Sequence, residues 1–369
     1  MSYPNGPAMR GGAPSQTPAA TSLFRRLVWE GTVPLEIKID SKELPAGSDR
    51  GLECYYIQAP RISYLPLLLP DIKKHLTDLV LDEANAGLLK EDDWWFEETE
   101  RGGLMRWHWP IGLLYDYNTI SHGLHSTVPP LPGSSTPTQP LRLTLHLISP
   151  PLDKLLLTPS TESCKLSYMG QLKEADFLRW GNTKRVTGLR KQDHDGLWES
   201  LKNHNFDDFW RIASKIFPTT TPLSPNASPN PNGTSTFASP PSAALALPPN
   251  SSTLSPSRPP STDPSGPPVA DRDGAYTVRS VPVRIYLPDG PVLQDLVPPL
   301  VDERAHTLRQ FLRTHLPLLF PPPPSQPQAY ALVQGVVCPP DAEMAWLGAC
   351  MAGADGWVNV CIGLGRPPR

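Results

Sequence analysis

The sequence lacks an excess of basic residues. Its 369 residues include 33 Lys and Arg against 36 Asp and Glu, which gives a formal net charge of −3 at pH 7. Proteins that bind nucleic acid need a basic surface to displace the counterions of the phosphates. The charge balance therefore argues against nucleic acid as a partner.

Cysteine is also scarce. The cysteines are odd in number, lie far apart and form no CxxC pair; they are Cys54, Cys164, Cys338, Cys350 and Cys361. A disulfide framework or a zinc knuckle needs paired, regularly spaced cysteines. We therefore predict free, mostly buried thiols in a reducing compartment, and neither a metal nor another cofactor.

Long hydrophobic runs are missing. The longest candidate, ISYLPLLLP at 62–70, is interrupted by Pro66, whereas a membrane-spanning helix needs about 18 apolar residues. The N-terminal MSYPNGPAMR contains no apolar core of a secretory signal. We expect a soluble, cytoplasmic protein whose membrane contact, if any, is peripheral.

Proline, in contrast, is abundant, with 48 residues, and hydrophobic residues make up only 39% of the chain. Residues 1–20 are rich in Pro, Gly, Ser and Ala. Residues 218–270 are rich in Pro and Ser and carry only Arg258 and Asp263 as charged residues. Such segments bury too little apolar surface to offset their chain entropy. We predict a disordered tail over 1–20 and a disordered linker over 218–274.

Two ordered pieces share a pattern. TVPLEIKID at 32–40 and SVPVRIYLP at 280–288 each have Val-Pro followed by alternating apolar and polar residues, which is typical of a half-buried strand. In both pieces a helical segment follows the strand. It begins at Pro70 in the first piece and after a Thr307 cap in the second. Both pieces then return to strands, and we expect one of these over LMRWHW at 104–109.

A small sheet wrapped over one helix accounts for each piece. Two copies of this unit predict an α+β protein in which two ubiquitin-like β-grasp domains flank a helix-rich domain. The predicted boundaries are a tail at 1–20, a first ubiquitin-like domain with an N-terminal helix at 21–150, a helix-rich domain at 151–217, a linker at 218–274, and a second ubiquitin-like domain at 275–369.

The helix-rich domain contains YMGQLKEADFLRW at 168–180. At 100° per residue, Lys173 falls at the centre of an apolar stripe whose other members lie within about 40° of it; they are Leu166, Met169, Phe177 and Trp180. Periodicity alone favours a lysine that lays its stem along apolar surface, with Glu174 or Asp176 close enough to pair with its amine. The alternative is an amine positioned to attack an acyl group.

Other candidate reactive groups are weaker. His194 lies between Asp193 and Asp195, and a helix start capped by one of them is the better interpretation than a metal site. His108 on the predicted strand should face away from Trp107 and Trp109, as a structural histidine. The cysteines lie among apolar residues, as inert thiols do. No residue pattern specifies an active site.

Several segments resemble the autophagy protein 5 family. They are YMGQLKEADFLRW, KQDHDGLWESLKNHNFDDFW, RISYLPLLLPDIKKH, LMRWHWPIGLLYD and LVWEGTVPLEI. The resemblance covers 22–120 and 141–217, and more weakly 276–365. Trp109 stands where many relatives have Tyr. The chain ends in GLGRPPR without the terminal glycine of a ubiquitin-like donor, as expected of an acceptor.

The resemblance implies a non-catalytic autophagy scaffold in the cytoplasm, recruited to the preautophagosomal structure or isolation membrane as a peripheral protein. Lys173 would be joined through an isopeptide bond to the ubiquitin-like autophagy protein 12, delivered by conjugating enzymes. The conjugate would bind a helix of autophagy protein 16 and promote lipidation of autophagy protein 8 with phosphatidylethanolamine during autophagosome assembly.

The groove for that partner helix is predicted at the aromatic block of Trp29, Trp107, Trp109 and Ile111, although most of these residues fit a plain core better. Two other functions stay open. One is a thiol-dependent enzyme of ubiquitin-like conjugation that uses one of the cysteines. The other is an adaptor that never becomes conjugated.

Overall fold

The computed structural model describes residues 18–44, 54–79, 90–125, 139–155, 158–220 and 274–367. The predicted disordered tail and linker fall almost entirely outside these ranges. Helix α1 (Ala19–Glu30) begins inside the segment assigned to the tail, and Thr219 pairs with Gly274 across the linker. No helix of the described residues is both long and apolar enough to cross a membrane.

The first sheet domain has the strand order β2-β1-β5-β3-β4, with β1 and β5 parallel. Its strands are β1 (Thr32–Ile39), β2 (Tyr55–Pro60), β3 (Trp95–Glu98), β4 (Gly103–Leu104) and β5 (Leu141–His146). Its helices are η1 (Leu65–Leu68), α2 (Leu69–Leu79), η2 (Glu91–Asp93) and α4 (Ile111–His125). Leu35 and Ile37 of β1 are buried, as the sequence pattern predicts, but Glu36 between them, expected on the polar face, is buried as well.

The strand predicted over 104–109 is wrong beyond Leu104, where β4 ends. The Trp109 amide donates to the Arg106 carbonyl (2.8 Å), which closes a turn that leads into Pro110. Trp107 and Trp109 therefore do not share one face of a strand. Each is buried in a different hydrophobic cluster.

The second sheet domain repeats the strand order of the first, as β7-β6-β12-β10-β11. Its strands β6 and β12 are parallel, as β1 and β5 are in the first sheet. Its strands are β6 (Val281–Tyr286), β7 (Val292–Val297), β10 (Ala329–Val333), β11 (Val336–Val337) and β12 (Val358–Leu364), beside a ribbon of β8 (Leu300–Val301) and β9 (Arg304–Ala305). Helices α10 (Leu308–His315) and α11 (Met344–Cys350) complete it. Thr307 caps α10 in a reciprocal box with Gln310, so the predicted cap is confirmed.

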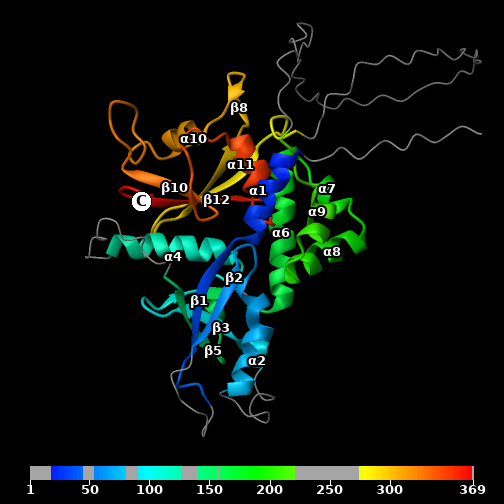
Figure 1. Cartoon of the computed structure of the whole chain (residues 1–369), viewed down its shortest axis with the longest axis vertical. Helices are drawn as coiled ribbons and strands as arrows, with labels where there is room; N and C mark the ends of the chain where they lie inside the picture. The colour runs from blue at the N-terminus through cyan, green and yellow to red at the C-terminus, as the bar shows by residue number, and fades with distance from the viewer. Residues whose placement is uncertain are drawn as a thin grey trace, which may run out of the picture. The chain divides into compact units, whose positions relative to one another are not determined.

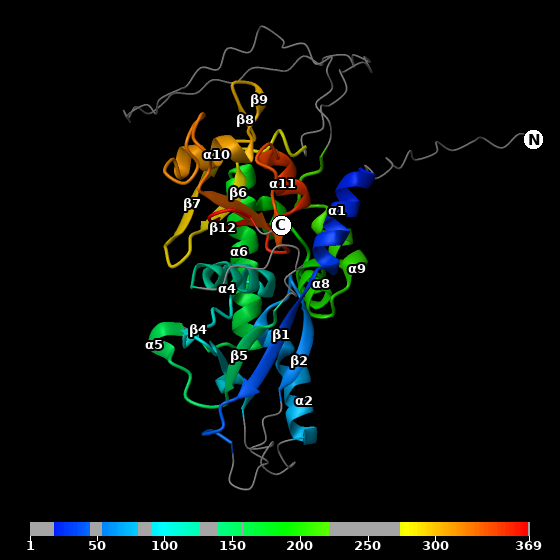
Figure 2. The same cartoon turned by 60° about the vertical axis from the view of Figure 1, so that its left-hand side comes forward.

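The helical region between the sheets comprises α5 (Leu152–Leu155), α6 (Thr161–Trp180), α7 (Lys184–Thr187), α8 (Lys191–Lys202) and α9 (Phe206–Ala213). Ser160 caps the start of α6, and Gly181 ends it in the left-handed conformation (φ 75°), which glycine adopts at little cost. Figures 1 and 2 both show α6 running alongside the two sheet domains. The predicted fold class, two similar small sheet domains flanking helices, is confirmed.

Candidate functional site

Helix α6 turns only part of the predicted apolar stripe away from the core, since Met169 and Trp180 are half-buried and pack against it. Its buried face consists of Cys164, Tyr168, Leu172, Ala175, Asp176 and Arg179. Lys173 is exposed, and two other members of the stripe are also on the outside, with Leu166 69% and Phe177 49% exposed. The lysine therefore does not interrupt a core. It stands on the surface, on a stripe of which Leu166 and Phe177 are exposed and Met169 and Trp180 are half-buried.

The carboxylates next to Lys173 are engaged elsewhere. Glu174 accepts from the Arg284 guanidinium (2.9 Å) and from the Gln294 amide (3.2 Å), both in the second sheet domain. Asp176 is buried, accepts from the Val186 amide (3.1 Å), and has its pKa raised by burial. Within the described part of the chain, the Lys173 amine has no ion-pair or hydrogen-bond partner.

Two residues before Lys173, Gln171 ties α6 to both sheet domains. Its side-chain amide donates to the His108 carbonyl (3.2 Å), and its side-chain oxygen accepts from Arg284 (2.6 Å). Its main-chain carbonyl accepts from the Trp357 indole (3.1 Å). The backbone that carries the lysine is therefore anchored from two sides.

The predicted partner-helix residues lie in the interior. Trp29 is 3%, Trp107 4%, Trp109 8% and Ile111 0% exposed. Trp29 donates to the His204 carbonyl (3.2 Å), and Trp109 packs edge-on against Tyr286 with ring centroids 4.8 Å apart. Burial to this extent favours the core interpretation of all four side chains over direct contact with a partner.

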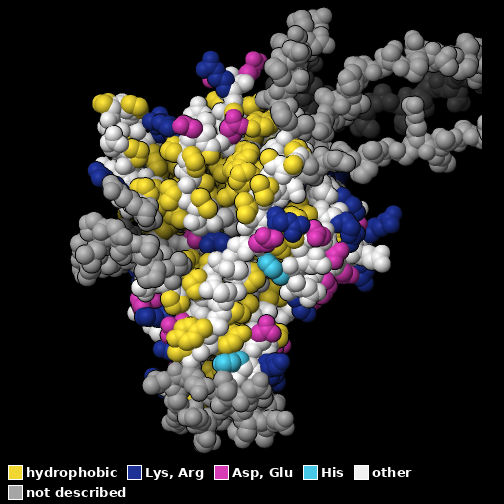
Figure 3. Space-filling model, in the orientation of Figure 1, with side chains coloured by type: hydrophobic (Ala, Val, Ile, Leu, Met, Phe, Trp, Pro, Cys, Tyr) yellow, Lys and Arg dark blue, Asp and Glu magenta, His cyan; other side chains and the backbone are white. Residues whose placement is uncertain are grey.

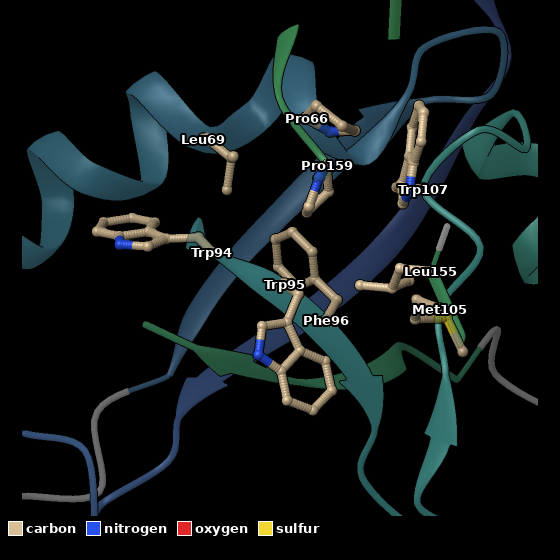
Figure 4. Close-up of a pocket in the computed structure, with 9 residues that line it drawn as sticks. All are labelled: Pro66, Leu69, Trp94, Trp95, Phe96, Met105, Trp107, Leu155 and Pro159. Carbon is tan, nitrogen blue, oxygen red and sulfur yellow. The ribbon is translucent and has the colours of Figure 1, made fainter. Parts of the chain in front are cut away.

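Trp107 does line a small gap between the first sheet domain and the start of the helical region, together with Trp94, Phe96 and Leu155 (Figure 4). The space measures about 10 Å³, which is at the lower limit for a single water molecule. The gap therefore has no room for a partner side chain.

A larger apolar groove lies between α1, the turn from β10 to β11, and α11. We call it the α1 groove. It has a volume of about 680 Å³ and its apolar lining includes Phe24, Leu27, Val28, Val336, Trp346 and Met351. Figure 3 shows the apolar surface that α1, α10 and α11 share. Sequence reasoning missed this groove because its walls come from opposite ends of the chain.

The other candidate nucleophiles among the described residues include four buried thiols. Burial raises the pKa of Cys338 and Cys350 to about 11, and it raises the pKa of Cys164 and Cys361 as well. Helix α8 starts from Arg190 without a side-chain cap, so the predicted cap by Asp193 or Asp195 is wrong.

One polar cluster surrounds His146 at the end of β5. The Nδ1 atom lies 3.0 Å from the Glu43 carboxylate and 3.8 Å from that of Asp40, and Nε2 lies 3.1 Å from Glu97. Both ring nitrogens thus face carboxylates, and Trp95 stacks on the ring at 4.0 Å. These contacts hold the ends of neighbouring strands together.

Comparison with known proteins identifies three matching family models. Residues 28–147 match the UblA domain of autophagy protein ATG5, residues 161–219 its alpha-helical bundle region, and residues 280–362 its UblB domain. A relative named Autophagy protein 5 from Neosartorya fischeri is 30% identical, over 96% of this chain and 99% of the relative. Another of that name from Phaeosphaeria nodorum is 28% identical, over 93% and 97%.

A solved structure shares the fold. The crystal structure of Kluyveromyces marxianus Atg5 superposes with a TM-score of 0.59 at 19% sequence identity, over 92% of this chain and 98% of that one. The sheet–helix–sheet arrangement is therefore common to both chains.

Proposed function

Because the chain belongs to the autophagy protein 5 family, we propose that it is a non-catalytic autophagy scaffold and that Lys173 is its conjugation acceptor. The donor is the ubiquitin-like autophagy protein 12, whose C-terminal glycine forms an isopeptide bond with the lysine. The single observation that carries the proposal is the exposed Lys173 amine on an anchored helix, with both neighbouring carboxylates engaged by other groups.

The chemistry needs little from this chain. A conjugating enzyme carries the donor as a thioester on its own cysteine. The neutral Lys173 amine attacks the thioester carbonyl, the new C–N bond forms, the C–S bond breaks, the thiolate leaves, and the nitrogen loses a proton. An accessible amine that makes no ion pair among the described residues is free to reach the thioester.

The proposed binding site of the partner helix, which belongs to autophagy protein 16, is the α1 groove. An amphipathic helix binds by laying one apolar face into such a groove. Phe24 and Trp346 pack edge-on there, with ring centroids 4.9 Å apart, and give the groove an aromatic wall. The assembled conjugate would act at the isolation membrane as a peripheral, cytoplasmic complex that promotes lipidation of autophagy protein 8.

The thiol-enzyme alternative is disfavoured by the raised pKa values of four buried thiols, since the thiolate is the nucleophile. Cys54 is half-buried, with its sulfur 3.7 Å from the Glu36 carboxylate. If Cys54→Ser abolished thioester formation while the fold survived, the scaffold proposal would be wrong.

The decisive experiment co-expresses the chain with the conjugation enzymes and the donor, and follows its mobility on a denaturing gel. We expect an upward shift that Lys173→Arg abolishes. The matched control is Lys165→Arg on the same helix, where the lysine is paired with Asp195 (3.1 Å), and it should retain the shift. Persistence of the shift in Lys173→Arg would remove Lys173 as acceptor, and absence of any shift in the parent chain would favour the unconjugated adaptor.

A further inference from the structure

A second groove lies in the second sheet domain, between α10, β10 and the segment that follows α10. We call it the α10 groove. It has a volume of about 790 Å³, and its apolar lining includes Leu312, Phe320, Tyr330 and Val337. A volume of this size holds several side chains, well beyond what a small anion needs.

The α10 groove touches the α1 groove but does not coincide with it. Cys338 lines both, Pro339 lines only the α1 groove, and Pro340 lines only the α10 groove. The segment 338–340 therefore forms a ridge between two separate apolar hollows. Figure 3 shows the apolar surface continuing across this part of the molecule, with charged side chains around its margin.

The charges of the two grooves differ. Asp341 and Glu343 line the α1 groove, together with Arg61, which is paired with Asp116. The described residues that line the α10 groove include three arginines and no carboxylate. Arg309 pairs with Asp341 (2.9 Å), which lies outside the α10 groove, whereas Arg313 and Arg366 have no ion-pair partner among the residues that the structure describes. An apolar floor with unpaired cations at its rim is complementary to a ligand that carries both apolar groups and negative charge.

We propose that the α10 groove is a docking site for a short peptide segment of a partner protein, with apolar side chains for the floor and Asp or Glu for Arg313 and Arg366. This site is separate from the α1 groove and from Lys173. Its occupant is therefore independent of the helix partner and of the donor, and failure of either earlier proposal leaves this one standing.

The test uses the full chain and a phage-displayed library of 12-residue peptides. Peptides are selected on the parent chain and counter-selected on the double variant Arg313→Glu/Arg366→Glu. Enriched sequences are synthesised with a fluorophore and titrated by fluorescence anisotropy at low and high salt. Urea denaturation of each variant verifies that it remains folded.

We expect enriched peptides that combine apolar residues with Asp or Glu, and a loss of affinity of about tenfold or more in the double variant, because like charges then face each other. Arg313→Lys/Arg366→Lys should retain most of the affinity. Lys191→Glu/Lys202→Glu on α8 makes the same change in net charge at a distant, exposed place and should have little effect. High salt should weaken binding.

Several results would overturn the proposal. One is that no peptide is enriched, or that the enriched peptides are uncharged and bind the double variant equally well. Another is that Leu27→Glu in the α1 groove abolishes binding, which would place the peptide there. A third is a dimer of the chain in sedimentation that the Arg313→Glu/Arg366→Glu change dissociates, because a second copy would then occupy the groove.

Discussion

Arg284 and Trp357 stack within the second sheet domain, with the guanidinium carbon 3.7 Å from the indole centroid. The same guanidinium reaches Gln171 and Glu174 on α6, so one side chain joins the second sheet domain to the helix that carries Lys173. Arginine suits this place because its planar fork can stack and donate at the same time.

Arg284→Ala should therefore lower the free energy of unfolding by about 2–3 kcal/mol, since it removes charge-assisted hydrogen bonds and a cation–π contact. Glu174→Gln should cost less than about 1 kcal/mol, because Glu174 is 45% exposed. Urea denaturation measures both. Equal losses in the two variants would mean that neither the stacking on Trp357 nor the hydrogen bond to Gln171 contributes to stability.

The two faces of α6 should respond differently to truncation. Leu172 is 1% exposed, and Leu172→Ala should cost about 2–5 kcal/mol of stability. Leu166 is 69% exposed, and Leu166→Ala should stay within about 0.5 kcal/mol. Chemical denaturation of this pair tests the orientation of the helix. A large loss in the Leu166 variant would contradict an outward-facing stripe.

His108 should make stability depend on pH. Burial lowers its pKa from 6.5 to about 4, so the unfolded chain binds more protons than the folded chain between these values. Stability is then complete above pH 6.5 and is lost as pH falls toward 4, by up to about 2–3 kcal/mol. His108→Gln should remove this part of the difference between urea midpoints at pH 7 and pH 5. If parent and variant lost the same stability, His108 would not be the titrating group.

Helix α1 supplies a matched pair for the α1 groove. Leu23 and Leu27 are 57% and 56% exposed, but only Leu27 lines the groove. Leu27→Glu should weaken binding of an autophagy protein 16 helix peptide at least about tenfold, because a carboxylate would lose its hydration in an apolar groove. Leu23→Glu should leave the affinity nearly unchanged. Calorimetric titration measures both, and equal effects would place the helix elsewhere.

Local patterns predicted most of the fold. The Val-Pro strands, the Thr307 cap and the two similar sheets follow from alternation and capping, which involve residues close in the chain. The outward face of α6 could not be predicted in this way. Its buried face includes Asp176 and Arg179, which are held by the Val186 amide and by the Gly356 carbonyl (2.8 Å). Helical periodicity assigns charged residues to the exposed side of a helix, so it did not identify the buried face of α6.

The site was predictable only in part. Lys173 stood out in the sequence, but the engagement of Glu174 by Arg284 depends on a contact between residues 110 positions apart. The α1 groove depends on still more distant partners, such as Phe24 and Trp346. No local pattern carries such pairings, so the sequence could not distinguish a groove from a core at the aromatic block of Trp29, Trp107, Trp109 and Ile111, although a core was the better interpretation for most of them.

The anchoring of Gln171 to both sheet domains limits how the part of α6 that carries Lys173 can move. Rotation or fraying of this part of α6 would break contacts to two domains at once. The mobile part at this position is therefore the flexible four-carbon side chain of Lys173 alone. A donor joined there would pivot about that side chain on a fixed base, and its position would be decided by the surface it meets next to α6.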